Sequence, residues 1–180
     1  MSYLLVAHGT RKPVGVNMIG RLAERVSGLL ARPVHVAFVD VLGPTPSDVL
    51  RELPAHRPVT VVPAFLTSGY HVRVDLPAHV AASGHPAVAV TKPLGPCPST
   101  VQVLSQRLVE CGWRPGDSVV LAAAGTSDPR AHSDVRRTAA TLSATIGHRV
   151  ELAYAATGGP RVKDAVAKLR RDERTREWPI

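Results

Sequence analysis

The feature that most constrains the fold of this chain is an internal repeat. Residues 4–53 and 120–169 align without a gap at a constant offset of 116 residues. Positions that match between the two segments include Leu5/Leu121, Ala7/Ala123, Gly9/Gly125, Thr10/Thr126, Ala37/Ala153, Gly43/Gly159, Pro44/Pro160 and Asp48/Asp164. Such a repeat indicates one structural unit present twice. Residues that both copies share are then explained by the fold, and a residue that only one copy holds needs another explanation.

His8 is such a residue, because Ala124 occupies the equivalent position of the second copy. The Gly and Thr after it, Gly9 and Thr10, are present in both copies. We therefore interpret the turn as structural and the imidazole as an addition specific to the first copy.

Short apolar runs alternate with helical periodicity along both copies. The expected strands are residues 3–7, 34–39, 59–65, 87–91, 118–123 and 150–155. The expected helices are residues 14–30, a short one ending near 53, then 75–82, 99–111, 131–146 and 160–171. The first helix has Met18, Leu22, Val26, Leu29 and Leu30 on its apolar side. Alternating strands and helices predict an α/β fold, with a parallel sheet that has helices on both faces, in two tandem repeated halves.

The second half is incomplete. We expect a first half at residues 1–112, an incomplete second repeat at 117–172 and a charged tail at 173–180. The second half has no counterpart of residues 59–71 or of the later part of the first half. Either the chain is shortened, or a partner covers the incomplete sheet, because an unpaired strand edge recruits another chain. A homodimer would provide that cover.

The net charge of +8 favours an anionic partner: nucleic acid, an anionic lipid surface, or a polycarboxylate or phosphate molecule. The basic residues are scattered, aromatic residues make up only 4%, and no nucleic-acid-binding signature occurs, so we do not expect nucleic acid. The sequence has no basic leader followed by a long apolar stretch, and no apolar run approaches the roughly 20 residues of a membrane span. We expect a cytoplasmic protein without a membrane partner. Cys97 and Cys111 are too few for a disulfide framework and are expected to be buried thiols.

Three polar residues, His8, Asp40 and His71, follow the carboxyl ends of expected strands. In open parallel sheets, ligands bind at this edge. Two imidazoles and a carboxylate suit a divalent first-row metal. Histidine side chains can also take up protons near neutral pH. The second copy has Ala124 opposite His8 and Ala156 opposite Asp40, as a single asymmetric site would produce.

Each of the three also has a structural interpretation. A histidine after a strand can be a hydrogen-bonded turn residue, Asp40 can cap the turn toward Gly43, and His71 can be a solvated loop residue. Their joint placement at equivalent strand ends favours the metal site.

Residues 4–11, Leu-Leu-Val-Ala-His-Gly-Thr-Arg, and residues 61–77, Val-Val-Pro-Ala-Phe-Leu-Thr-Ser-Gly-Tyr-His-Val-Arg-Val-Asp-Leu-Pro, resemble the sirohydrochlorin chelatase family. These are the ATP-independent cobalt and iron chelatases of cobalamin and sirohaem synthesis. The second motif, Phe-Leu-x-x-Gly-x-His followed by Asp-Leu-Pro, is the specific one. The resemblance covers essentially the whole chain and implies a chelatase-like fold.

The resemblance implies insertion of Co²⁺ or Fe²⁺, as substrate, into sirohydrochlorin or a related tetrapyrrole. His8 and His71 would be metal ligands and proton acceptors, and the acidic ligand position falls on Asp40, where many relatives have Glu. A polycarboxylate tetrapyrrole also gives the basic charge a function. The residues expected to bind it are Arg11, Lys12, Arg73, Gly9 and Thr10.

The sequence contains neither a phosphate-binding G-x-x-x-x-G-K motif nor a G-x-G-x-x-G motif, so no nucleotide cofactor is expected. An alternative is a non-catalytic metal-binding or tetrapyrrole-binding protein derived from a chelatase, because the second half is shortened. The hypothesis of a metal-dependent hydrolase has less support, because the sequence shows no further acidic ligands and no evident nucleophile. Ligand type does not separate cobalt from iron, because both metals accept imidazole and carboxylate.

Overall fold

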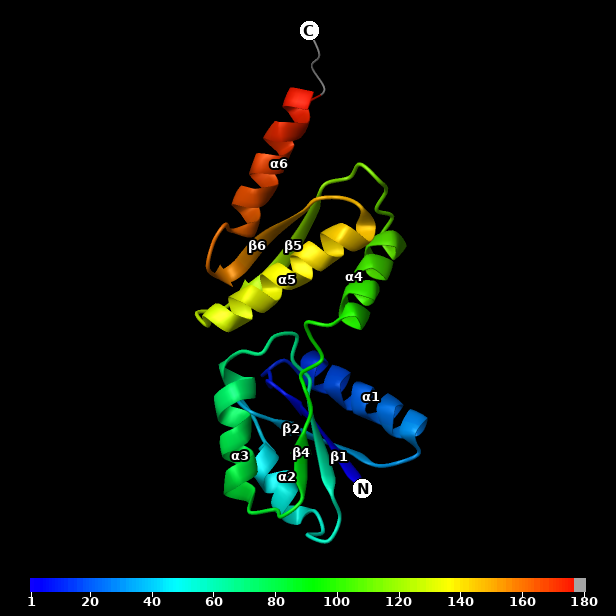
Figure 1. Cartoon of the computed structure of the whole chain (residues 1–180), viewed down its shortest axis with the longest axis vertical. Helices are drawn as coiled ribbons and strands as arrows, with labels where there is room; N and C mark the ends of the chain where they lie inside the picture. Colours follow the sequence, from blue (N-terminus) through cyan, green and yellow to red (C-terminus); the bar gives the residue numbers. More distant parts are fainter. Residues whose placement is uncertain (177–180) are drawn as a thin grey trace. The chain divides into compact units, whose positions relative to one another are not determined.

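A computed structural model describes the backbone of residues 1–176 and the side chains of residues 1–172. The chain forms two compact units, unit 1 (Met1–Gly95) and unit 2 (Pro96–Ile180) (Figure 1). Each unit has its own parallel sheet.

Unit 1 is built on four parallel strands in the order β2-β1-β3-β4. Its elements are β1 (Ser2–Ala7), α1 (Pro13–Leu30), β2 (Val34–Phe38), α2 (Pro46–Glu52), β3 (Val59–Pro63), the π-helical turn η1 (His71–Asp75), α3 (Leu76–Ser83) and β4 (Val88–Val90). The central strand β1 pairs with β2 on one side and with β3 on the other. Ala7 lies opposite Phe38, and Val6 lies opposite Pro63, so the three strands end at the same edge of the sheet.

Helices cover both faces of the unit 1 sheet. The chain moves from β1 to β2 in one direction and from β2 to β3 in the other, so right-handed connections put α1 and α2 on opposite faces. Figure 1 shows this arrangement, with α3 beside α2. Leu4, Val6, Val61, Leu50 and Leu76 are fully buried in one cluster between the sheet and these two helices. The predicted α/β architecture is confirmed.

The first helix packs through only part of the side that the sequence predicts, since Val26 is the member of that side nearest the buried Ala23. Met18 and Leu29 are 62% and 80% exposed, whereas Ala23 is buried. Ile19 and Val26 are half-buried on the same side as Ala23. Small and branched residues at this spacing let the helix lie close to the sheet, and the larger apolar side chains are left outside.

Unit 2 contains a two-stranded parallel sheet. Its elements are α4 (Pro98–Glu110), β5 (Val119–Gly125), α5 (Pro129–Ile146), β6 (Val150–Thr157) and α6 (Val162–Arg176). The division between the units falls after Gly95, ahead of the expected boundary at residues 112–117, because α4 packs against α5. Helix α6 extends into the expected charged tail at 173–180, of which residues 177–180 lie outside the described residues. Cys97 is half-buried and Cys111 is exposed, so the expectation of two buried thiols was wrong.

Equivalent hydrogen bonds recur in the two units at the offset of the sequence repeat. The turn after the first strand has a backbone N–H donating to a Thr hydroxyl, Lys12 to Thr10 in unit 1 and Asp128 to Thr126 in unit 2. After the second strand, the N–H of Phe38 donates to Pro44 O and that of Tyr154 to Pro160 O, both at 2.9 Å. Ser27 Oγ donates to Arg32 O and Ser143 Oγ to His148 O, both at 2.8 Å. The two units thus share one local framework.

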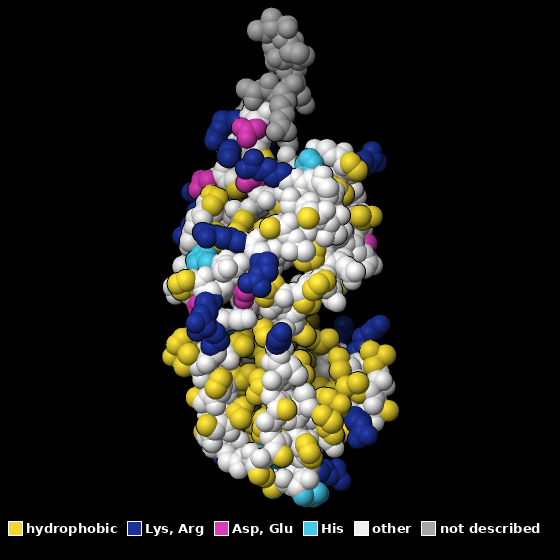
Figure 2. All heavy atoms as spheres, viewed as in Figure 1, with side chains coloured by type: hydrophobic (Ala, Val, Ile, Leu, Met, Phe, Trp, Pro, Cys, Tyr) yellow, Lys and Arg dark blue, Asp and Glu magenta, His cyan; other side chains and the backbone are white. Residues whose placement is uncertain are grey.

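The surface shows no single basic patch on the face drawn in Figure 2, where Lys and Arg side chains are distributed over both units. Hydrophobic side chains are widespread over unit 1 on the same face. Within residues 1–176, none of the helices is both long enough and apolar enough to span a membrane.

Candidate metal site

His8 and Asp40 are brought together by a close approach between the ends of β1 and β2. The backbone N–H of Asp40 donates to His8 O at 3.0 Å. Gly9, the next residue, has φ +100°, and a Cβ atom there would lie 2.1 Å from Asp40 O. Only glycine combines this backbone conformation with this contact. Glycine at position 9 is therefore a condition for placing the first histidine beside the carboxylate.

His71 comes from the segment after β3, which is fixed along its length. The N–H of Ala64 donates to Val6 O at 2.7 Å, and the N–H of Gly95 donates to Phe65 O at 3.0 Å. A Cβ atom at Gly95 would lie 2.7 Å from Leu66 O, so the two stretches of chain are in direct backbone contact. The segment then enters η1, in which the N–H of Leu76 bonds to His71 O. Single π-helical turns of this kind occur frequently at functional sites.

The three predicted residues meet at this edge of the sheet. One ligand atom from each of His8, Asp40 and His71 lies within 4.8 Å of the other two. The two imidazole rings are nearly perpendicular, at 88°, with centroids 4.5 Å apart. His8 and Asp40 are exposed and His71 is half-buried, so the cluster opens to solvent. Among the described side chains, no other group of three His, Cys, Asp or Glu residues comes this close together.

Hydrogen bonds engage the same nitrogen in both imidazoles. His71 Nδ1 lies 2.6 Å from Asp75 Oδ2, and His8 Nδ1 lies 3.2 Å from Gly9 O. Within the described residues, the remaining nitrogen of each ring, Nε2, makes no hydrogen bond. Asp40 Oδ1 accepts the N–H of Val41 at 2.7 Å, which holds the carboxylate at the end of its strand.

Asp75 is the residue that the sequence-based site lacks. It is four residues after His71, in the Asp-Leu-Pro part of the specific motif, and spacing of i and i+4 at the start of a helix puts two side chains on one face. That spacing becomes a signal only once the helical turn is known to begin at His71, ahead of the expected helix at residues 75–82. An open pocket of about 500 Å³ lies beside the cluster and is lined by Val39, Asp40, His71, Asp75, Ala78, His79 and Ala82.

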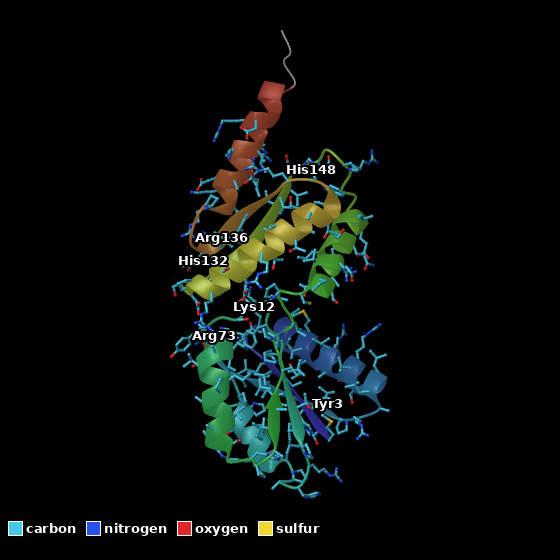
Figure 3. The ribbon with its side chains drawn as sticks, viewed as in Figure 1. Tyr3, Lys12, Arg73, His132, Arg136 and His148 are labelled. Atoms are coloured by element: carbon cyan, nitrogen blue, oxygen red, sulfur yellow. The ribbon has the colours of Figure 1, made fainter. Side chains whose placement is uncertain are left out.

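The predicted substrate-binding residues fall into two groups. Arg11 and Lys12 are exposed in the turn after β1, and Arg73 is exposed on η1, where its Nε donates to Ser68 O at 3.0 Å. Figure 3 shows Lys12 and Arg73 at the end of unit 1 where the strands terminate, and Tyr3 nearer the opposite end. Gly9 and Thr10 instead make contacts that unit 2 repeats, and these contacts account for them structurally.

Comparison with known proteins places this chain in a family. Residues 2–111 and 118–176 match the family model described as CbiX. A sirohydrochlorin cobaltochelatase of Methanothermobacter thermautotrophicus is 28% identical over 127 residues, which are 58% of this chain and 88% of that protein.

Two solved structures share the fold. SirB from Bacillus subtilis with Fe³⁺ has a TM-score of 0.80 at 22% identity. SirB from Bacillus subtilis subspecies spizizenii in complex with cobalt has a TM-score of 0.74 at 24% identity. Each match covers 93% of this chain and 70% of the solved chain. The family model spans nearly the whole sequence in two segments, each of which contains one copy of the repeat, and the chain therefore belongs to the CbiX family, the sirohydrochlorin chelatase family that its two motifs predict.

Proposed function

We propose that this protein inserts Co²⁺ or Fe²⁺ into sirohydrochlorin or a related polycarboxylate tetrapyrrole, with the metal as substrate. The observation that carries the proposal is the convergence of His8, Asp40 and His71 within 4.8 Å at an exposed sheet edge. The proposal is further supported by the curated cobaltochelatase relative.

In this proposal, the three side chains hold the metal only until it is transferred. Two imidazoles and one carboxylate suit both cobalt and iron. Three protein ligands leave coordination positions open, as in catalytic rather than structural metal sites. The exposure of His8 and Asp40 leaves the site accessible to a flat macrocycle.

Metal insertion also releases two protons, because the macrocycle gives up two pyrrole N–H protons as its nitrogens bind the metal. A histidine that releases the metal recovers the lone pair on Nε2 and can accept a proton there. His8 and His71 therefore act as ligands first and as bases afterwards. Arg11, Lys12 and Arg73 would bind the substrate's carboxylates by charge-assisted hydrogen bonds, and no nucleotide cofactor takes part.

The test is metallation of sirohydrochlorin by the purified chain, followed by its absorption change with Co²⁺ and with Fe²⁺. We expect His8→Ala and His71→Ala each to lower the rate above background by at least about 100-fold. His56→Ala is the matched control, because His56 is exposed in unit 1 in the turn before β3, at the opposite end of the sheet. Wild-type activity in both site variants would reject the proposal. Stoichiometric binding of metal or tetrapyrrole without turnover would favour the non-catalytic binding protein instead.

We also propose that a second copy of the chain covers β5 by antiparallel pairing of the two β5 strands. Within the described residues, β5 pairs only with β6, whereas β1 has a strand on each side. Ala122 is exposed, while its counterpart Val6 is fully buried. Beside this strand lies a pocket of about 210 Å³, lined mainly by apolar side chains of α4, β5 and α5. Residues 118–125 carry no charge, so two such edges can meet without like-charge repulsion.

A further inference from the structure

We infer that Asp75 is a positioning residue for metal transfer: its carboxylate accepts the Nδ1–H of His71, fixes the tautomer of that ring and so presents Nε2 to the metal. The role of Asp75 rests on the proposed function, because the metal it serves is the one held by His8, Asp40 and His71.

The contact between the two side chains is short and local. His71 Nδ1 and Asp75 Oδ2 are 2.6 Å apart, and both side chains are about one-third exposed, at 32% and 30%. The first and last residues of η1 form this pair, and Asp75 is followed directly by the fully buried Leu76. The carboxylate is therefore anchored by the same helical turn that carries the imidazole.

The environment of the ring favours one orientation. Phe65 lies nearly parallel to the His71 ring, at 28° with centroids 6.3 Å apart, and Tyr70 lies edge-on at 6.4 Å. With Nδ1 held by Asp75, rotation of the ring would break a charge-assisted hydrogen bond, which is about twice as strong as a neutral one.

The two histidines are consequently held in different ways. His8 Nδ1 faces the neutral carbonyl of its own neighbour, Gly9, at 3.2 Å, and His8 is exposed. His71 faces a carboxylate at 2.6 Å and is half-buried. A carboxylate behind a ligating imidazole fixes its tautomer and raises its ligand strength, and loss of such a partner lowers metal affinity by about 10- to 100-fold. His71 is thus the anchored ligand of the pair.

The decisive variant is Asp75→Asn in the full chain. An amide nearly matches the carboxylate in shape but removes its charge, and its NH₂ group can donate to Nδ1, which would move the ring proton to Nε2 and block the ligand atom. We expect Co²⁺, added without tetrapyrrole, to bind about 10- to 100-fold more weakly and with an altered visible absorption spectrum. Asp75→Glu restores the charge and should recover part of the affinity. Glu52→Gln, at the exposed end of α2, removes the same charge elsewhere on unit 1 and should leave Co²⁺ binding unchanged.

The position of the ring proton of His71 can be measured without an activity assay. In wild-type protein, ¹⁵N-resolved NMR of the His71 ring should show the proton on Nδ1, and in Asp75→Asn it should show loss of that signature. The wild-type spectrum tests the assignment even if a variant fails to fold. A proton on Nε2 in the wild-type protein, or wild-type Co²⁺ affinity in a folded Asp75→Asn, would overturn the role of Asp75.

The outcomes separate this role from the proposed function. If the histidine variants lose metallation while Asp75→Asn binds Co²⁺ normally, only the role of Asp75 fails. If Asp75→Asn weakens Co²⁺ binding as expected while wild-type protein shows no metallation, the proposed function fails, and Asp75 keeps a positioning role in metal binding without metal transfer.

Discussion

The same turn closes the first strand in both units, and the side chain before it differs. Gly9 and Gly125 have φ values of +100° and +105°, and a Cβ atom on either would overlap a carbonyl at or just beyond the end of the neighbouring strand. The preceding residue is His8 in unit 1 and Ala124 in unit 2. The backbone therefore requires the glycine in both places and requires the histidine in neither, so the fold does not account for His8.

The units also differ in how their first strand is covered. β1 lies between β2 and β3, and Leu4 and Val6 on it are fully buried. β5 has a single neighbour, and the residues at the same repeat positions, Val120 and Ala122, are half-buried and exposed. Isolated two-stranded β structures are marginal in water, so unit 2 depends on its helices, or on a further strand, far more than unit 1 does.

The largest effect is expected from adding one methyl group to either glycine. Gly9→Ala and Gly125→Ala should each destabilise their own unit by more than about 3 kcal/mol, because a residue with a side chain must adopt a left-handed conformation and displace a strand carbonyl. Trp113 lies in unit 2, and unit 1 contains no tryptophan. Trp113 fluorescence during urea unfolding reports on unit 2, and hydrogen exchange of the Asp40 amide reports on unit 1.

The two glycine variants should differ in metal binding. Gly9→Ala moves Asp40 and should weaken Co²⁺ binding, whereas Gly125→Ala should leave it unchanged. Gly28→Ala is the control, because this exposed helical glycine has open space around it and alanine there should stabilise α1 by about 0.5–1 kcal/mol. Full stability in both turn variants would refute the requirement for glycine at these positions.

A smaller effect is expected at the uncovered strand. If two copies pair through β5, Ala122→Lys places like charges close together across the pairing and should weaken dimerisation by at least about 10-fold. Ala140→Lys makes the same change on the exposed side of α5 and should have no effect. Sedimentation over a range of concentrations measures both. A wild-type chain that stays monomeric at every concentration contradicts the pairing.

The sequence predicts the framework well because the framework is local and repeated. Strand ends, helix periodicity and the recurring Gly-Thr turn are enough to place His8, Asp40 and His71 at one edge, and the structure brings their ligand atoms together. Their role as metal ligands stays a prediction. Asp75 could not be assigned without knowing that the turn after Tyr70 is already helical, because only then do positions 71 and 75 share a face.

Longer-range packing is what the sequence pattern does not determine. The apolar stripe of α1 predicts that Met18 and Leu29 are buried, but both are exposed and the buried residue is Ala23. The expected halves place the unit boundary at residues 112–117, whereas the packing of α4 on α5 moves it to Gly95. In both cases tertiary contacts decide an outcome that the local pattern leaves open.

The smallest expected effect on stability is at the start of α2, where unit 1 has a helix-capping Thr that unit 2 lacks. The Thr45 hydroxyl accepts the N–H of Asp48 and donates to its Oδ2, while unit 2 has Arg161 at the position of Thr45. Thr45→Ala should destabilise unit 1 by about 1 kcal/mol at neutral pH. Thr141→Ala, within α5, removes a hydroxyl that only bonds back to Arg137 O and should be nearly neutral.

The effect of Thr45→Ala should also depend on pH in a definite direction. Hydrogen bonds from Thr45, with a smaller contribution from Arg51, hold the pKa of Asp48 below its ordinary value of 3.8. A carboxyl group whose pKa is lowered on folding stabilises the protein above its unfolded pKa, and that contribution is lost as the pH falls through the folded pKa. The stability difference between wild type and Thr45→Ala should therefore be constant above about pH 5 and narrow below pH 3.8. Urea unfolding at a series of pH values measures the difference, and a gap that widens on acidification would show that the cap does not act through the ionised carboxylate.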